Sequence, residues 1–151
     1  MEHDYKKYPE LTNHELKVGS MQFDSPHPQI TEDFEATVVK VHDGDTITLH
    51  TTFRDFDFPL RLAFIDAPEM NEGGDIARDW LTSKILGSKI NIKIDKANRV
   101  GKYGRLIGEV IHNGINMGQE MKMLGLVRPF VTRHEGKIPD LNQLFNMKQW
   151  F

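Results

Sequence analysis

Two short acidic stretches next to strand-like segments are the first candidates for chemistry in this sequence. The first, DGDT at residues 43–46, lies between two β-branched runs, and the second, DAPE at residues 66–69, follows an apolar run. Asp-Gly is a strong hairpin signal because it accepts the positive φ angles of tight turns. Asp45 would then be the first strand residue beyond the turn. The first stretch is therefore either a plain turn or half of a metal site.

The second stretch places carboxylates at the end of a predicted strand. Asp66 ends the run RLAFID, and Pro68 turns the chain immediately afterwards, which brings Glu69 close to Asp66. Asp45 and Asp66, with a backbone carbonyl and water, would offer the irregular all-oxygen ligand set that Ca²⁺ accepts. A turn followed by a helix-initiating acid explains the same residues equally well.

Two arginines accompany these acids. Arg61 lies inside an apolar strand and needs a partner, because a buried unpaired guanidinium is costly. It either bridges to Asp45 or Asp66, or it presents its fork to a phosphate. Arg105 ends the segment GKYGR, whose other residues also suit an ordinary turn.

The charge of the chain is unevenly distributed. The net charge is −3, but residues 84–137 hold eleven Lys/Arg against four Asp/Glu, a surplus of +7, and the rest of the chain carries −10. This asymmetry predicts a basic face beside an acidic site, unless the basic residues are scattered over solvated positions. The absence of cysteine excludes disulfides and thiolate ligands, which leaves oxygen and histidine for metal binding.

Length and local composition predict one domain preceded by an arm. A chain of 151 residues suits a single core, and no run reaches the roughly 20 apolar residues of a membrane span. The first residues lack the apolar core of a secretory signal, which favours an intracellular protein, with a secreted mature form as the alternative. Residues 1–33 are polar and aperiodic, so we expect an arm that is poorly ordered or docks on a partner, followed by a domain at 34–151.

The domain itself has a mainly β pattern. Alternation and β-branched residues predict five strands, and helical spacing with glycine stops predicts three helices. Such a set predicts an α+β, mainly β fold, a five-stranded OB-type Greek-key barrel with about three packed α-helices. The expected strands are 34–41, 46–53, 58–66, 89–95 and 105–111, with a strand-like segment at 126–131, and the expected helices are 73–87, 116–125 and 141–151.

The order of these motifs resembles the staphylococcal nuclease, or thermonuclease, family. DGDT, RLAFIDAPE, a helix and then KYGR opening a strand follow one another within residues 34–131. The family fold is the same OB barrel. The resemblance implies a Ca²⁺-dependent nuclease that hydrolyses phosphodiester bonds of DNA and RNA with little sequence specificity, prefers single or frayed strands, and leaves 3′-phosphate ends.

The resemblance also assigns roles to individual residues. Asp45 and Asp66 would bind Ca²⁺ directly, together with the backbone carbonyl of Ala67. Glu69 would act beside the metal through water, as the general base. Arg61 and Arg105 match the two arginines with which the family holds the phosphate.

Further matches lie around this centre. Asp43 matches an acid near the metal, and Lys102 and Tyr103 match positions that contact a terminal phosphate. In place of a tyrosine that stacks on the base, the nearest aromatic here is Phe130. The competing hypothesis is a catalytically weak OB-fold module that binds nucleic acid or serves in an assembly, with the arm contacting a protein partner. We expect a monomer.

Overall fold

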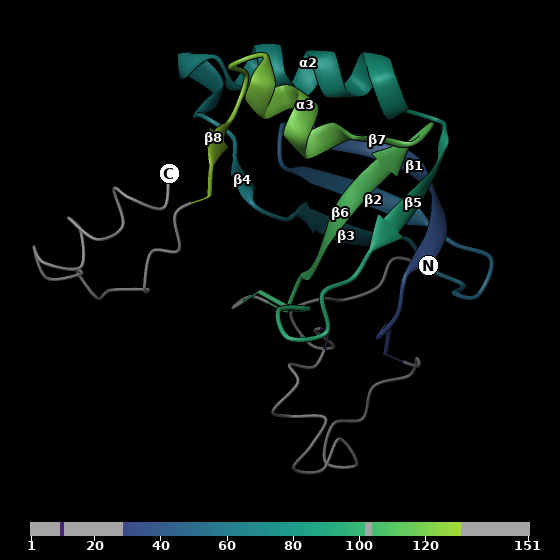
Figure 1. Ribbon diagram of the computed structural model, residues 1–151. Coiled ribbons are helices and arrows are strands. Elements are labelled where there is room, and N and C mark those ends of the chain that lie inside the picture. Colours follow the sequence, from purple (N-terminus) through teal and green to yellow (C-terminus); the bar gives the residue numbers. More distant parts are fainter. Residues whose placement is uncertain (1–9, 11–28, 102–103, 131–151) are drawn as a thin grey trace, which may run out of the picture.

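The computed structural model describes residues 10, 29–101 and 104–130 (Figure 1). Short strands dominate, and two α-helices and one turn of 3₁₀ helix are interspersed among them. In chain order the elements are β1 (Phe34–Asp43), β2 (Thr46–His50), β3 (Phe58–Leu62), β4 (Ile65–Asp66), η2 (Met70–Glu72), α2 (Gly74–Ile85), β5 (Lys89–Lys93), β6 (Leu106–His112), β7 (Ile115–Asn116), α3 (Met117–Met123) and β8 (Arg128–Pro129).

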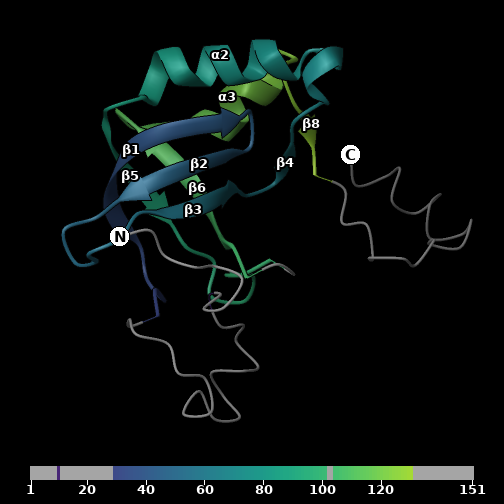
Figure 2. The same cartoon turned by 180° about the vertical axis from the view of Figure 1, so that it is seen from behind.

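Five strands form a closed barrel. They pair in the order β3-β2-β1-β5-β6, and a parallel pairing of β3 with β6 closes the sheet. Alternate side chains fill the interior: on β5, Ile90 and Ile92 are buried while the lysines at both ends are exposed. Both α-helices lie together at one end of the barrel, as the front and back views show (Figures 1 and 2). The predicted OB-type barrel is thereby confirmed.

The helices are close to those predicted. Within the described residues there are two α-helices, α2 and α3, and the predicted helix 141–151 lies outside them. Residues Ala77, Leu81 and Ile85 of α2 recur every four positions and are fully buried. Ile76 lies off that row and is 59% exposed. No helix in this part of the chain has the length and apolarity needed to cross a bilayer.

The predicted strand 58–66 is broken in the structure. β3 ends at Leu62, and the chain turns at Phe64, whose φ of 68° is left-handed. β4 then leaves the barrel and pairs with β8, so that Asp66 lies opposite Arg128 in a separate two-stranded sheet. The predicted strand 126–131 shortens to these two residues of β8.

The DGDT turn differs from the prediction in two respects. β2 begins at Thr46, so Asp45 belongs to the turn and not to the strand. Gly44 does not adopt a positive φ, and the reason for glycine is the close approach of other elements. A Cβ at Gly44 would lie 2.8 Å from the Cβ of Ala77 on α2 and 3.2 Å from the Cβ of Ala67.

The first turn of α2 fixes the second acidic stretch in a similar way. Gly74 donates its backbone N–H to the carbonyl of Glu69 over 2.9 Å. A Cβ at Gly74 would collide with the carbonyl of Pro68 and come within 2.8 Å of the carbonyl of Glu69. Helix α2 therefore packs against both acidic stretches and sets the distance between them.

Residues of the predicted arm contact the barrel at two places. Ile30 is buried in the core, and the Asp33 carboxylate accepts a hydrogen bond from the backbone N–H of Ile94 over 2.7 Å. Glu10, far earlier in the arm, also reaches the barrel. The Glu10 carboxylate lies 2.6 Å from Nη1 of Arg54, and both side chains are almost completely buried. The backbone N–H of Glu10 donates to the carbonyl of Gly104 over 2.9 Å. The remaining residues from 1 to 28 lie outside the described part of the chain.

Replacing Gly44 with alanine should destabilise the protein. The added methyl must displace Ala77 or Ala67, and overpacking of this kind costs about 1–3 kcal/mol. Chemical denaturation would measure the loss of unfolding free energy. Gly101→Ala is the matched control, because a Cβ there meets its nearest atom at 3.6 Å, an ordinary contact distance. Equal stability of the two variants would contradict the packing role of Gly44.

Candidate active site

Asp45 joins the two acidic stretches directly. Its Oδ2 accepts a hydrogen bond from the backbone N–H of Ala67 over 2.8 Å, and its Oδ1 accepts one from the hydroxyl of Thr46 over 3.1 Å. The residue is only 9% exposed. The backbone of Asp45 is fixed as well, because its N–H donates to a carboxylate oxygen of Asp43 over 3.0 Å. Asp43 therefore lies beside Asp45 and shapes the turn.

Burial makes the negative charge of Asp45 costly. Loss of solvent raises the pKa of this carboxyl above its ordinary value, and the neighbouring Asp43 carboxyl raises it further. The Ala67 N–H and the Arg61 guanidinium act in the opposite direction, but burial prevails. A further positive charge at this point would relieve the cost.

Arg61 lies between the two carboxylates. Its Nη1 donates to the carbonyls of Leu62 and Ile65, each over 3.0 Å. Nη1 also lies 3.4 Å from Oδ2 of Asp45, while Nη2 lies 3.4 Å from Oδ1 of Asp66. The ion-pair alternative for Arg61 is thus realised with both acids at once. Because two carbonyls fix the guanidinium, its remaining donors have a defined direction.

Arg105 reaches the same site through Thr46. The Nη1 of Arg105 lies 3.5 Å from the Thr46 hydroxyl, which in turn donates to Asp45. At this length the contact with Arg105 is weak, so the guanidinium of Arg105 is held less firmly than that of Arg61. Sequence reasoning missed Thr46 as a link between acid and arginine. Its place directly after Asp45 in DGDT was the available signal.

The other predicted site residues are less tightly fixed. The Asp66 side chain is 53% exposed, and among the described residues its hydrogen-bond and ion-pair partner is Arg61. Glu69 is exposed, and within the described part of the chain its side chain makes no hydrogen bond or ion pair. Both acids therefore face water beside the buried Asp45. Lys102 and Tyr103 lie outside the described residues.

The donor set fits a hard divalent cation. No ready-made group of three acidic, histidine or cysteine side chains occurs in the described part of the chain. Asp45 and Asp66 nevertheless converge, since both contact the one Arg61 guanidinium. Carboxylates, a carbonyl and water are the ligands that Ca²⁺ takes, and a cation would offset the burial that raises the pKa of Asp45.

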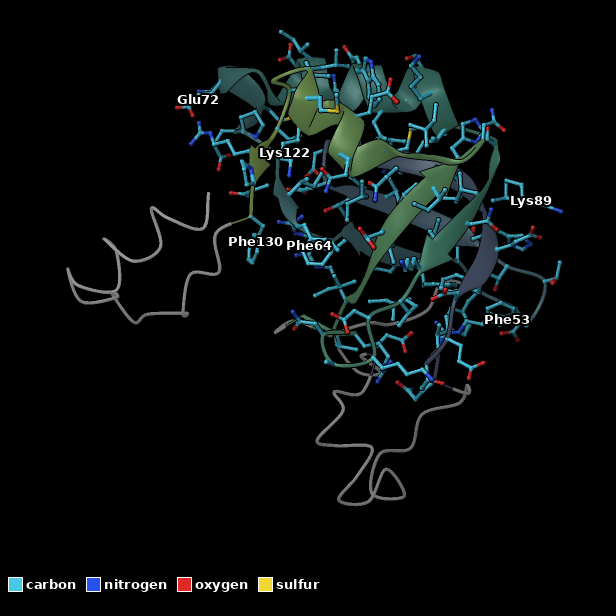
Figure 3. All side chains as sticks on the ribbon, in the orientation of Figure 1. Phe53, Phe64, Glu72, Lys89, Lys122 and Phe130 are labelled. Atoms are coloured by element: carbon cyan, nitrogen blue, oxygen red, sulfur yellow. The ribbon has the colours of Figure 1, made fainter. Side chains whose placement is uncertain are left out.

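Two of the basic residues between positions 84 and 137 lie away from this site. Arg99 is buried and donates to the carbonyl of Ile30 over 2.9 Å, so it serves the core. Lys89 at the start of β5 lies on the side of the barrel away from Phe130 (Figure 3). The arginine side chains that contact Asp45, Thr46 or Asp66 are, among the described residues, Arg61 and Arg105.

The fold and the site together define a class of protein. The class is an OB-type barrel that brings carboxylates and arginines together. The turn between two strands, β1 and β2, and the segment that follows the third strand, β3, place these residues side by side. Opposed charges of this kind suit the binding of a phosphate group beside a cation.

Comparison with known proteins agrees with this class. The sequence model of the staphylococcal nuclease homologue family matches residues 59–149, more than half of the chain. Two curated relatives, from Escherichia coli O157:H7 and Escherichia coli, each carry the name uncharacterized endonuclease. Each is 32% identical over 100 residues, which cover 65% of this chain and 62% of the relative. The chain belongs to the staphylococcal nuclease homologue family.

Asp45→Asn should change the pH dependence of stability, measured in a chelator. A raised pKa means that the folded state holds the Asp45 proton more tightly than the unfolded chain does. The wild type should therefore gain stability relative to the variant as pH falls through that raised pKa. The gain in stability should level off below about pH 3.9, which is the ordinary pKa of aspartate. Denaturation at several pH values measures it, and an opposite trend would mean that Arg61 and Ala67 outweigh burial.

Proposed function

We propose that this chain is a Ca²⁺-dependent nuclease that hydrolyses phosphodiester bonds of DNA and RNA and leaves 3′-phosphate ends. The observation that carries the proposal is the position of Arg61, fixed by two backbone carbonyls between Asp45 and Asp66. Such a group would bind an anion next to a cation site. The names of the two relatives support nuclease activity.

Asp45 and Asp66 would hold the Ca²⁺, with the carbonyl of Ala67 as a further ligand. When bound, this ion would neutralise charge that develops on the phosphoryl oxygens. The Asp45 carboxylate is already oriented for the task, because Ala67 and Thr46 each donate a hydrogen bond to it. Little reorganisation would then be needed on binding.

The two arginines and Glu69 would share the chemistry. Arg61 and Arg105 donate to the non-bridging oxygens of the phosphate, and their charge opposes the build-up of negative charge there. A water oxygen attacks phosphorus while its proton passes to the exposed Glu69 carboxylate. The bond from phosphorus to the 5′-oxygen breaks, and that oxygen takes up a proton. The products are a 3′-phosphate and a 5′-hydroxyl.

The substrate preferences follow from the groups involved. The proposed contacts of Arg61 and Arg105 go to phosphate, which carries no sequence information. Low sequence specificity is therefore expected. Single-stranded or frayed nucleic acid should be preferred, because its backbone can bend into a compact site.

Glu69→Gln should abolish most of the activity without unfolding the protein. The amide that replaces the carboxylate cannot accept the proton of the attacking water, and loss of a general base costs about 10²- to 10⁴-fold in rate. Degradation of single-stranded DNA with Ca²⁺, and with a chelator, measures this. Glu72→Gln is the matched control, since Glu72 is exposed on the neighbouring η2 turn. DNA that is bound but never cleaved by the wild type would favour the OB-fold binding module.

Arg105→Lys should separate charge from geometry. Lysine keeps the positive charge but cannot donate from a planar fork, so we expect turnover to fall by about 10²-fold or more. Stability should hardly change, because the contact of Arg105 with Thr46 is long. Steady-state kinetics and a melting curve test both expectations, and unchanged turnover would remove Arg105 from the mechanism.

A further inference from the structure

Phe64 combines an exposed aromatic ring with an unfavourable backbone conformation. Its φ is 68°, a left-handed value that bulky residues rarely adopt, and the residue is 52% exposed. Asparagine or glycine would satisfy the same turn with less strain. A half-exposed ring gains little from the core, so packing does not explain phenylalanine here. Strained residues of this kind concentrate at binding sites.

The backbone of Phe64 is joined to the arginine site through Phe130. The carbonyl of Phe64 accepts a hydrogen bond from the backbone N–H of Phe130 over 2.8 Å, which ties the turn after β3 to the end of β8. The ring of Phe130 is in turn 5.6 Å from the guanidinium carbon of Arg61, and Phe130 is 47% exposed. Figure 3 shows Phe64 and Phe130 on the same side of the molecule. One exposed aromatic ring, Phe130, therefore lies beside the proposed phosphate-binding group, and a second exposed aromatic residue, Phe64, is bonded to it through the backbone.

We propose that Phe64 is a base-binding residue, whose ring stacks on a nucleobase of the strand that Arg61 holds by its phosphate. A nucleotide joins a flat π surface to an anion, and this side of the molecule offers the exposed Phe64 together with the guanidinium of Arg61, which two carbonyls fix. Stacking is tolerant of sequence because every base has a π face, and it requires bases that are not paired within a duplex. The inference rests on the proposed nuclease function for its substrate class.

Binding to paired probes would test the proposal. In a chelator, the full chain is titrated into a labelled oligothymidylate and into an abasic strand of the same length and charge. We expect the wild type to favour the strand with bases. Phe64→Asn should weaken binding of oligothymidylate about tenfold and leave the abasic strand unchanged. Its melting temperature should stay level or rise, because asparagine tolerates the left-handed φ.

Three further variants make the outcome specific. Phe64→Trp should retain the preference for bases, and Phe64→Gly replaces Phe64→Asn if the latter does not fold. Phe53→Asn is the matched control: Phe53 is also exposed, at 53%, but lies on another side of the barrel (Figure 3). It should bind both strands as the wild type does.

Several results would overturn the proposal. The first is that the wild type binds both strands equally. The second is that Phe64→Asn keeps the preference for the strand with bases, and the third is that Phe64→Asn loses affinity for both strands to the same degree. Cleavage with Ca²⁺ is measured separately. A wild type that cleaves DNA but ignores bases refutes only the role of Phe64, while one that favours bases but never cleaves refutes only the nuclease function.

Discussion

The site depends on one hydrogen bond, from the backbone N–H of Ala67 to the carboxylate of Asp45. The two residues are 22 positions apart, on the turn after β1 and on the segment after β4. The bond forms only because Gly44 lets Ala67 and helix α2 approach the turn to within van der Waals distance. Barrel, helix and acidic stretches therefore meet at a single point, and a change in any one of them alters the position of the Asp45 carboxylate.

The same arrangement accounts for the electrostatics. Burying Asp45 near Asp43 is unfavourable, as the raised pKa of Asp45 shows, and Arg61 compensates only in part. Arg61 is itself anchored to the carbonyls of Leu62 and Ile65, so it cannot move fully onto either acid. A cation bound beside Asp45 would relieve part of this cost and would thereby stabilise the folded chain.

The sequence predicts the architecture well and the local geometry less well. The alternation of apolar and polar residues in β5 and the four-residue spacing of apolar residues in α2 are periodic signals. They predict these elements correctly because one face of each element is buried. The break between β3 and β4 has no such signal: residues 62–65 are all apolar, and phenylalanine at position 64 gives no hint of a left-handed φ. The placement of Asp45 in the turn was missed by one position for a related reason, since strand ends depend on pairing across the sheet.

The candidate residues show the same division. Motif order identifies Asp45, Arg61, Asp66 and Arg105, and the structure brings these four together. Motif order does not reveal that Thr46 links Asp45 to Arg105, since a threonine at the start of a strand is common. The role of Gly44 was also assigned to the wrong cause, because steric contacts with a distant helix leave no local pattern.

Glu10 has a consequence for where the folded unit begins. Its buried carboxylate contacts Arg54, and its backbone N–H holds the carbonyl of Gly104, the residue before Arg105. A chain cut to start at Phe34 would keep every barrel strand and yet bury Arg54 without that carboxylate, and it would release one restraint on the loop that carries Arg105. The barrel strands and the residues that hold the segment before Arg105 therefore begin at different points of the same chain.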